Sequence, residues 1–223
     1  MKRINRAGIA LILAGIVLTA VYMYRYEYRD SYQKKEAMSD AGISDGIIMK
    51  KSKKKSCQKD SKNCNRGQDE NIPMPYKNID LAALHKKNGD VCGYIMIPDS
   101  IISYPVMYSP DDTYLHKDYH KDYSYHGSIY TRHRTDSYPL VLFGHNMRDG
   151  TMFASIKRYA DASYRKKHRY AYLYTNKGWQ IYKFDSFKII SPDYDDFRDD
   201  RMYLVTCQGK EDRFLTEWKP VGV

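Results

Sequence analysis

The chain has 223 residues and a formal net charge of +10 at neutral pH. This length is enough for one domain of ordinary size with additional segments at its ends. The positive charge does not by itself indicate nucleic-acid binding, because the chain has neither a zinc-finger pattern nor basic residues interleaved with aromatic ones. Its four cysteines lack the CxxC or Cys/His spacing of a metal site, so we expect no metal ion and no cofactor.

An apolar run at residues 7–23 follows a short basic end, residues 1–6, which contains Lys2, Arg3 and Arg6. Its length is near the lower limit for a membrane-spanning helix. A cleaved signal peptide is the alternative, but the tyrosine-rich residues that follow offer no small-residue cleavage site and are typical of an interfacial aromatic belt. The sequence therefore predicts a single-pass signal-anchor at 7–23, with residues 1–6 in the cytoplasm.

Residues 24–75 are predicted to form a polar tether, in which positive charge is densest at residues 50–55. Such lysine-rich runs are usually solvated and flexible. Attraction to anionic lipid or to a wall polymer is the functional alternative. Cys57 and Cys64 lie in this tether, where they either form a small disulfide outside the cell or remain two free thiols.

Residues 76–223 are predicted to form one mainly β domain. A short helix is expected at residues 78–87, because Gly89 follows its end, and two more are expected at 153–159 and 162–168. Apolar runs bounded by turn residues predict eight strands, at residues 93–97, 103–107, 127–130, 140–143, 170–175, 179–190, 202–206 and 213–219. Imperfect alternation within 179–190 indicates a bulge, and the number and spacing of the strands favour a closed or nearly closed barrel.

The most informative segment is the run YLVTC at residues 203–207, followed by Gln208-Gly209-Lys210. A short apolar strand here would carry the Cys207 thiol at its end, next to a turn that leaves the sulfur open to a substrate. Arg213 follows at the start of the next strand and could donate to a carbonyl oxygen that becomes an oxyanion. A buried structural cysteine is the alternative, because free cysteine is among the most buried residue types.

A second apolar run, at residues 140–143, ends in Gly144-His145-Asn146. A thiol with an ordinary pKa of about 8.5 is only slightly ionised at neutral pH, so a nucleophilic cysteine needs a base or a cationic neighbour. His145 can fill this role, although a lone histidine at a strand end is more often structural. The other six histidines lie in polar surroundings rich in tyrosine and lysine, which favours solvated side chains.

Four segments in order along residues 91–218 resemble the sortase family, the cysteine transpeptidases of Gram-positive bacterial surfaces, and are most similar to class B. The segment LFGHNMRDGTMF at residues 142–153 resembles the class B pattern around the catalytic histidine, and LVTC at 204–207 resembles the nucleophile strand. The remaining similarity lies in residues 91–106 and in the pair of segments 114–115 and 126–130.

The resemblance implies an eight-stranded sortase-type barrel with His145, Cys207 and Arg213 as its catalytic residues. It also gives Asn146, Val205 and Thr206 as candidate substrate-binding residues. The interval between Cys207 and the arginine is short for class B, which leaves Arg201 as a rival for the guanidinium role. The segment at 191–201 lacks the long helix-containing insertion usual in class B, so we expect a more open substrate groove.

The resemblance further implies a reaction. Cys207 would cleave an NPxTN-like or xPxTG-like C-terminal sorting signal of a secreted protein after threonine, through a thioacyl intermediate. The protein would then be transferred to an amine of a cell-wall precursor or a pilin, by a catalytic domain outside the cell membrane. Two other functions remain open: another extracellular cysteine peptidase, although papain-like enzymes have the opposite order of cysteine and histidine, and an inactive wall-binding module.

Overall fold

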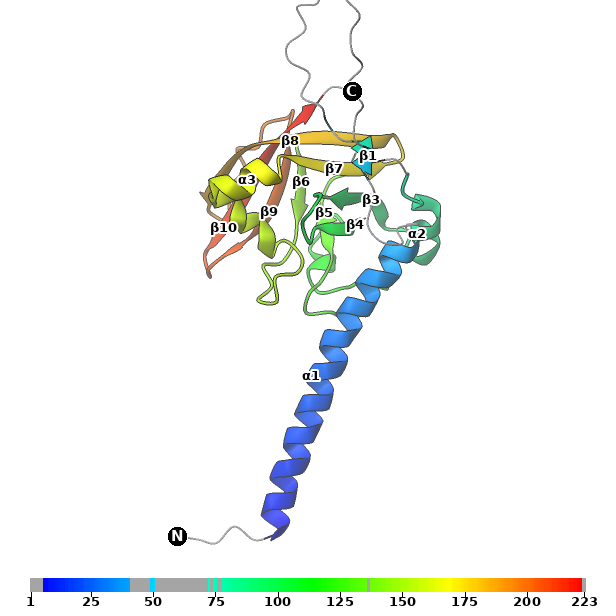
Figure 1. Ribbon diagram of the computed structural model, residues 1–223, viewed down its shortest axis with the longest axis vertical. Coiled ribbons are helices and arrows are strands. Elements are labelled where there is room, and N and C mark those ends of the chain that lie inside the picture. Colours follow the sequence, from blue (N-terminus) through cyan, green and yellow to red (C-terminus); the bar gives the residue numbers. More distant parts are fainter. Residues whose placement is uncertain are drawn as a thin grey trace, which may run out of the picture.

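The fold is known from a computed structural model, which describes residues 6–40, 49–50, 72, 74–75, 78–135 and 137–221. Eight strands form a closed barrel in the order β10-β8-β7-β3-β4-β5-β6-β9 (Figure 1). The barrel strands are β3 (Val91–Met96), β4 (Ser103–Tyr108), β5 (Ile129–Thr131), β6 (Leu140–Phe143), β7 (Tyr170–Thr175), β8 (Gly178–Ile190), β9 (Met202–Gln208) and β10 (Asp212–Val221). All eight predicted strands are thus confirmed, with bounds that move by at most two residues.

The barrel is closed around an interior of large apolar side chains. Tyr159, Phe184 and Trp218 lie together there, with ring centroids 4.8–5.5 Å apart. Trp218 is fully buried and donates its indole N–H to Thr216 Oγ1 at 2.9 Å, which satisfies its one polar group. Burial of such side chains, worth roughly 1.5–3 kcal/mol each, is the main stabilisation of the barrel.

The predicted bulge in the long strand β8 is confirmed. Glu217 of β10 pairs with Ser186, but Trp218 pairs with Phe184, so Asp185 is an extra residue on β8. Such an extra residue bends a strand and increases its twist, which helps a sheet to close. β7 and β8 are joined by a tight turn in which Gly178 has a φ of 91°, a conformation that favours glycine.

The short helices lie close to their predicted positions. α2 (Leu81–Lys87) begins at Asp80, whose side chain accepts a hydrogen bond from the backbone N–H of Ala83. Two further short helices, η2 (Ala154–Ala160), a 3₁₀-helix, and α3 (Ala162–Lys167), follow β6. The remaining elements are the 3₁₀ turn η1 (Thr113–Leu115) and the paired strands β1 (Met49–Lys50) and β2 (Met74–Pro75).

The first helix is longer than the sequence predicts. α1 (Arg6–Asp40) extends through residues 24–40, which the composition assigns to the tether. Its last turns are helical because they dock on the barrel: Ala37 is buried, and Glu36 pairs with Lys87 of α2 at 3.3 Å and with His120 at 3.1 Å. Residues 24–40 of the predicted tether are thus helical, and Cys57 and Cys64 lie outside the described residues.

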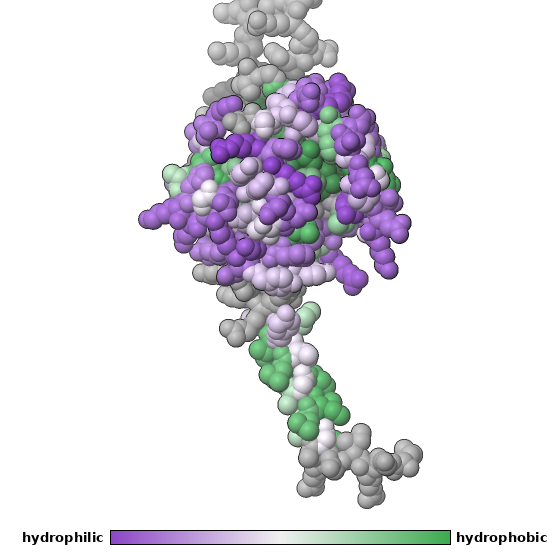
Figure 2. Space-filling view, turned by 180° about the vertical axis from the view of Figure 1, so that it is seen from behind, coloured by the Kyte–Doolittle hydropathy of each residue, from purple (hydrophilic) through white to green (hydrophobic). Residues whose placement is uncertain are grey.

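The apolar run at residues 7–23 lies in the first half of α1, which projects away from the barrel (Figure 1). Its large apolar side chains are exposed, and Figure 2 shows them in green on the helix. In the part of the chain that the structure describes, no helix combines the length and apolar character needed to cross a membrane. The helix at 7–23 is thus confirmed, but the predicted membrane span is not found among the described residues.

Candidate active site

Three neighbouring strands bring together the three residues expected to be catalytic. β6 and β9 run parallel with Phe143 opposite Val205, and each strand carries its candidate two residues further on, His145 and Cys207 respectively. β10 runs antiparallel to β9, with Arg213 directly opposite Cys207. The register therefore places a base, a thiol and a guanidinium at one end of the barrel, although they are far apart in sequence.

A backbone carbonyl holds the ring of His145. Its Nε2 lies 2.8 Å from the carbonyl oxygen of Leu115, in the loop that follows β4. A carbonyl can only accept, so Nε2 carries the proton and Nδ1 of the neutral ring is left as an acceptor. Burial lowers the pKa of His145, the bond to Leu115 opposes this, and the nearby charges of His116 and His126 lower the pKa further. The ring is thus neutral at neutral pH and ready to take a proton.

Hydrogen bonds tie the end of β6 to the end of β9. The hydroxyl of Thr206 donates to the carbonyl oxygen of Gly144 at 2.7 Å, and the Gly144 N–H donates to the carbonyl oxygen of Val205 at 3.1 Å. The side-chain amide of Asn146 donates to the carbonyl oxygen of Cys207 at 3.0 Å. These bonds fix the backbone on both sides of the His145–Cys207 pair.

The three candidate substrate-binding residues, Asn146, Val205 and Thr206, all have contacts within the protein. Val205 and Thr206 are buried, at 4% and 2% exposure, and as neighbours in β9 their side chains lie on opposite faces of the sheet. The amide of Asn146 is bonded to the backbone of Cys207. Each therefore has a structural contact in the unliganded protein, and a role in substrate binding stays a prediction.

The two arginines have different surroundings. Arg213 is half-buried at the start of β10, where Nη1 donates to the carbonyl oxygen of Asp212 at 3.1 Å. Arg201 is buried in ion pairs with Glu217, at 3.3 Å, and with Asp200. Because a strand rises about 3.3 Å per residue, Arg201 lies about 20 Å along β9 from the thiol. The geometry therefore favours Arg213 for the contact with substrate.

For two other histidines the predicted exposure to solvent is wrong. His126, expected to be solvated, is buried and pairs with Asp149 at 2.9 Å. His168, also expected to be solvated, is buried and bonds the carbonyl oxygen of Pro98 through Nδ1 at 2.9 Å. Their sequence neighbours are polar, but their partners come from distant segments. Among the described residues, no group of three His, Cys, Asp or Glu side chains is arranged to hold a metal ion.

Neither cysteine of the barrel forms a disulfide. Cys92 is half-buried within β3 and packs against the barrel interior, with its Sγ 3.3 Å from the carbonyl oxygen of Val106. Cys207 is also only half-buried, and it is the last but one residue of β9, where it pairs with Arg213 of β10. Both thiols are thus reduced. Cys207 lies next to the loops at the end of the barrel, whereas Cys92 lies within β3.

Comparison with known proteins identifies the family. The family model described as the sortase domain matches residues 95–220, more than half of the chain. This chain belongs to the sortase family. The match covers seven strands and the last residues of β3, and it includes His145, Cys207 and Arg213.

Two relatives named Sortase B place this sortase in class B. The chain is 37% identical to Sortase B of Listeria monocytogenes over 94 residues, which cover 40% of this chain and 38% of that protein. It is 28% identical to Sortase B of Staphylococcus aureus over 130 residues, which cover 54% of this chain and 53% of that protein. The chain thus spans about half, or less, of the curated relatives that it matches.

A solved structure supports the fold. The crystal structure of sortase B from B. anthracis in complex with AAEK1 has a TM-score of 0.65 and 21% sequence identity, and the match covers 90% of this chain and all of that one. At this identity the likeness concerns the fold alone. It agrees with the closed eight-stranded barrel described above.

Proposed function

We propose that this sortase is a cysteine transpeptidase that cleaves the C-terminal sorting signal of a secreted protein after threonine and transfers the protein to an amine. The strand register carries the proposal, because it places Cys207, His145 and Arg213 at one end of three adjacent strands. A thiol, a base with a free Nδ1 and a guanidinium are the groups that acyl transfer through a thioester requires.

In the first half-reaction, Sγ of Cys207 forms a bond to the threonine carbonyl carbon while its proton passes to Nδ1 of His145. Arg213 donates hydrogen bonds to the oxyanion of the tetrahedral intermediate. The peptide C–N bond then breaks, and His145 gives its proton to the departing amine. A thioester between Cys207 and the threonine remains.

In the second half-reaction, the amino group of the acceptor attacks the thioester carbonyl and gives a proton to His145. The C–S bond breaks, and the thiolate of Cys207 takes this proton back from the imidazole. We propose an amine of a cell-wall precursor or of a pilin as the acceptor. Water can replace the amine, and the product is then the hydrolysed protein.

The segment at 191–201 supports a permissive substrate groove. It joins β8 to β9 without a helix of its own, and Tyr194 and Phe197 pack against the outer side of β9. A segment of this kind leaves fewer side chains to enclose a peptide than a long insertion would. We propose that both NPxTN-like and xPxTG-like signals are accepted.

The exposed apolar side chains on the first half of α1, from Ile9 to Tyr24, support attachment to the cell membrane with the barrel outside. Apolar surface of this extent is unfavourable in water. Full-length protein should sediment with membranes and resist extraction at alkaline pH, and Leu13→Asp together with Ile16→Asp should release it. Recovery of the unsubstituted protein in the soluble fraction would contradict this attachment.

The thioester is the most direct test of the proposed reaction. Full-length protein incubated with a sorting-signal peptide and no acceptor amine should gain the mass of the acyl fragment on Cys207, which hydroxylamine then removes. Cys92→Ala should gain the same mass and Cys207→Ala should not. An adduct on Cys92 alone, or a cleaved peptide without any adduct, would argue for another hydrolytic mechanism.

A further inference from the structure

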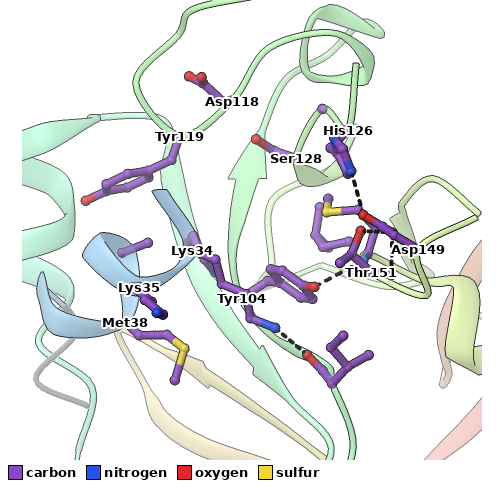
Figure 3. A pocket seen from close by; sticks show the side chains of 16 residues that line it. Lys34, Lys35, Met38, Tyr104, Asp118, Tyr119, His126, Ser128, Asp149 and Thr151 are labelled. Carbon is purple, nitrogen blue, oxygen red and sulfur yellow. Dashed lines mark hydrogen bonds and ion pairs between the residues drawn. The ribbon is translucent and has the colours of Figure 1, made fainter. Parts of the chain in front are cut away.

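A second pocket lies between α1 and the barrel, and its lining does not include His145, Cys207 or Arg213. Figure 3 shows this pocket, of about 590 Å³, with Lys34 and Met38 of α1 on one side and the ring of Tyr104 of β4 next to Lys34. The loop that ends in Asp149 and Thr151 forms the opposite wall. Pockets of this volume commonly hold small organic ligands.

The walls are mainly apolar. Met38 from α1, Ile129 from β5, and Met152 and the ring of Tyr104 face the pocket. Ile129, Tyr104 and Met152 also belong to the barrel interior, so the pocket is an opening of the core toward α1. An apolar body of a ligand would gain free energy here at about 25 cal/mol per Å² of apolar surface removed from water.

Lys34 lines the pocket and forms no ion pair with an acidic side chain among the described residues. Lys34 is half-buried; its Nζ donates to the carbonyl oxygen of Ile101 at 2.8 Å and lies 4.2 Å from the centre of the Tyr104 ring. Burial lowers the pKa of Lys34 to about 8, and no charged neighbour contributes. An ammonium has three donors, so Lys34 retains capacity for an anion. Lys35 adds a second positive charge at the edge of the pocket.

The carboxylates of the pocket are bonded elsewhere. Asp149 pairs with His126 at 2.9 Å and accepts from the hydroxyl and N–H of Thr151. Asp118 accepts from the backbone N–H groups of His120 and Asp122 at 2.8 and 3.0 Å. Asp149 is thus bound by His126 and by its own loop, and Asp118 by its own loop, so the bonds of both acids are made to groups other than Lys34.

We propose that this pocket binds a small single-chain amphiphile with an acidic head, a carboxylate or a phosphate, against Lys34 and an apolar chain along Met38, Ile129 and Met152. This site goes beyond the proposed transpeptidase function and does not depend on it. Its ligand would touch the loop at Asp149 and Met152, whose other end carries His145, so the two sites share one loop.

The test compares octanoate, octyl phosphate and the neutral octanol by titration calorimetry. Full-length protein is carried in nanodiscs of zwitterionic lipid, and the heat from empty nanodiscs is subtracted. Octanoate and octyl phosphate should bind with 1:1 stoichiometry, at least tenfold more tightly than octanol. Equal affinity for all three, or no binding beyond that of the empty nanodiscs, would overturn the proposal.

Variants locate the binding. Lys34→Met should lower the affinity for octanoate at least tenfold and leave that for octanol unchanged, whereas Lys34→Arg should keep the preference for the acid. Met38→Trp should fill the pocket and remove binding of both compounds. Lys86→Met, at an exposed position on α2, is the matched control and should bind octanoate as the unsubstituted protein does.

Octanoate affinity that is unchanged in Lys34→Met, or that survives in Met38→Trp, would also overturn the proposal.

The source of the acid is identified by replacing the nanodisc lipid with phosphatidylglycerol. A weaker apparent affinity for octanoate would show that an acidic membrane lipid reaches the pocket. An unchanged affinity would show that a free acid is its ligand, and both results keep the acidic chemistry.

Discussion

At the scale of single residues, the candidate base is held by a backbone group from a distant loop. The bond between His145 Nε2 and the carbonyl oxygen of Leu115 selects the tautomer, and it requires no acidic side chain. A carboxylate partner would stabilise the imidazolium and raise the pKa of the histidine. Here burial acts first and lowers the pKa of His145, so the neutral imidazole is the resting form.

This environment predicts the pH dependence of the reaction. Because the pKa of His145 is lowered, its ring stays neutral until the pH falls below the ordinary value of about 6.5. The acid limb of kcat/KM, which reports the free enzyme, should therefore be centred below pH 6.5. Peptide-cleavage kinetics between pH 5 and pH 9 measure it, and an acid limb centred above pH 7 would contradict the lowered pKa.

The two arginines give a matched pair of variants. Arg213→Ala should lower kcat/KM by about 10²-fold or more, as when one oxyanion donor is removed, and Arg213→Lys should rescue poorly because the planar fork is lost. Arg201→Ala should change the rate little. It should instead destabilise the fold by about 3–5 kcal/mol, because Glu217 would remain buried without its partner.

Cleavage rates and denaturant unfolding separate these effects. If Arg201→Ala were the slow variant and Arg213→Ala the nearly normal one, the guanidinium role would belong to Arg201. Because Arg213 lies opposite Cys207 and Arg201 pairs with Glu217, we expect Arg213→Ala to be the slow variant and Arg201→Ala the nearly normal one.

At the scale of elements, the hydrogen bond between β9 and the end of β6 should matter to catalysis. Thr206→Val removes the donor to the Gly144 carbonyl, which should cost about 1–3 kcal/mol of stability and lower kcat more than it raises KM. Thr206→Ser keeps the hydroxyl and should restore kcat. A normal kcat in Thr206→Val together with a loss in Thr206→Ser would mean that packing of the methyl group, not the bond, holds the pair in place.

The connection at 191–201 makes a prediction about specificity. With few side chains to enclose the peptide, we expect cleavage of matched NPxTN and xPxTG peptides with kcat/KM values that differ by less than a hundredfold. Binding energy lost at remote contacts should lower kcat as well as raise KM. A preference of a hundredfold or more, equivalent to about 2.7 kcal/mol, would show that other residues specify the groove.

At the scale of the whole molecule, features that depend on local sequence patterns are predicted correctly, whereas features that depend on long-range contacts are missed. The barrel strands were predictable because each is an apolar run that ends in turn residues, and Cys207 and His145 were found because each follows such a run. The helical residues 24–40 were missed because their stability depends on docking: Glu36 needs Lys87 and His120, which no local pattern reveals.

The burial of His126 and the bond from His145 to Leu115 were missed for the same reason, since each partner lies more than twenty residues away in sequence. The pocket beneath α1 was not predictable either, because it exists only where the helix meets the barrel. Contacts of this kind depend on the closed topology rather than on composition.

The central claim is that one thiol, at the end of β9, carries the reaction. Steady-state cleavage and transfer on a sorting-signal peptide should be measured for Cys207→Ala and for its matched control Cys92→Ala, with thermal unfolding of both. The account predicts that Cys207→Ala loses both reactions and keeps its fold, because a small side chain replaces a small one at a half-exposed position, and that Cys92→Ala retains both. Substantial turnover by folded Cys207→Ala would contradict it.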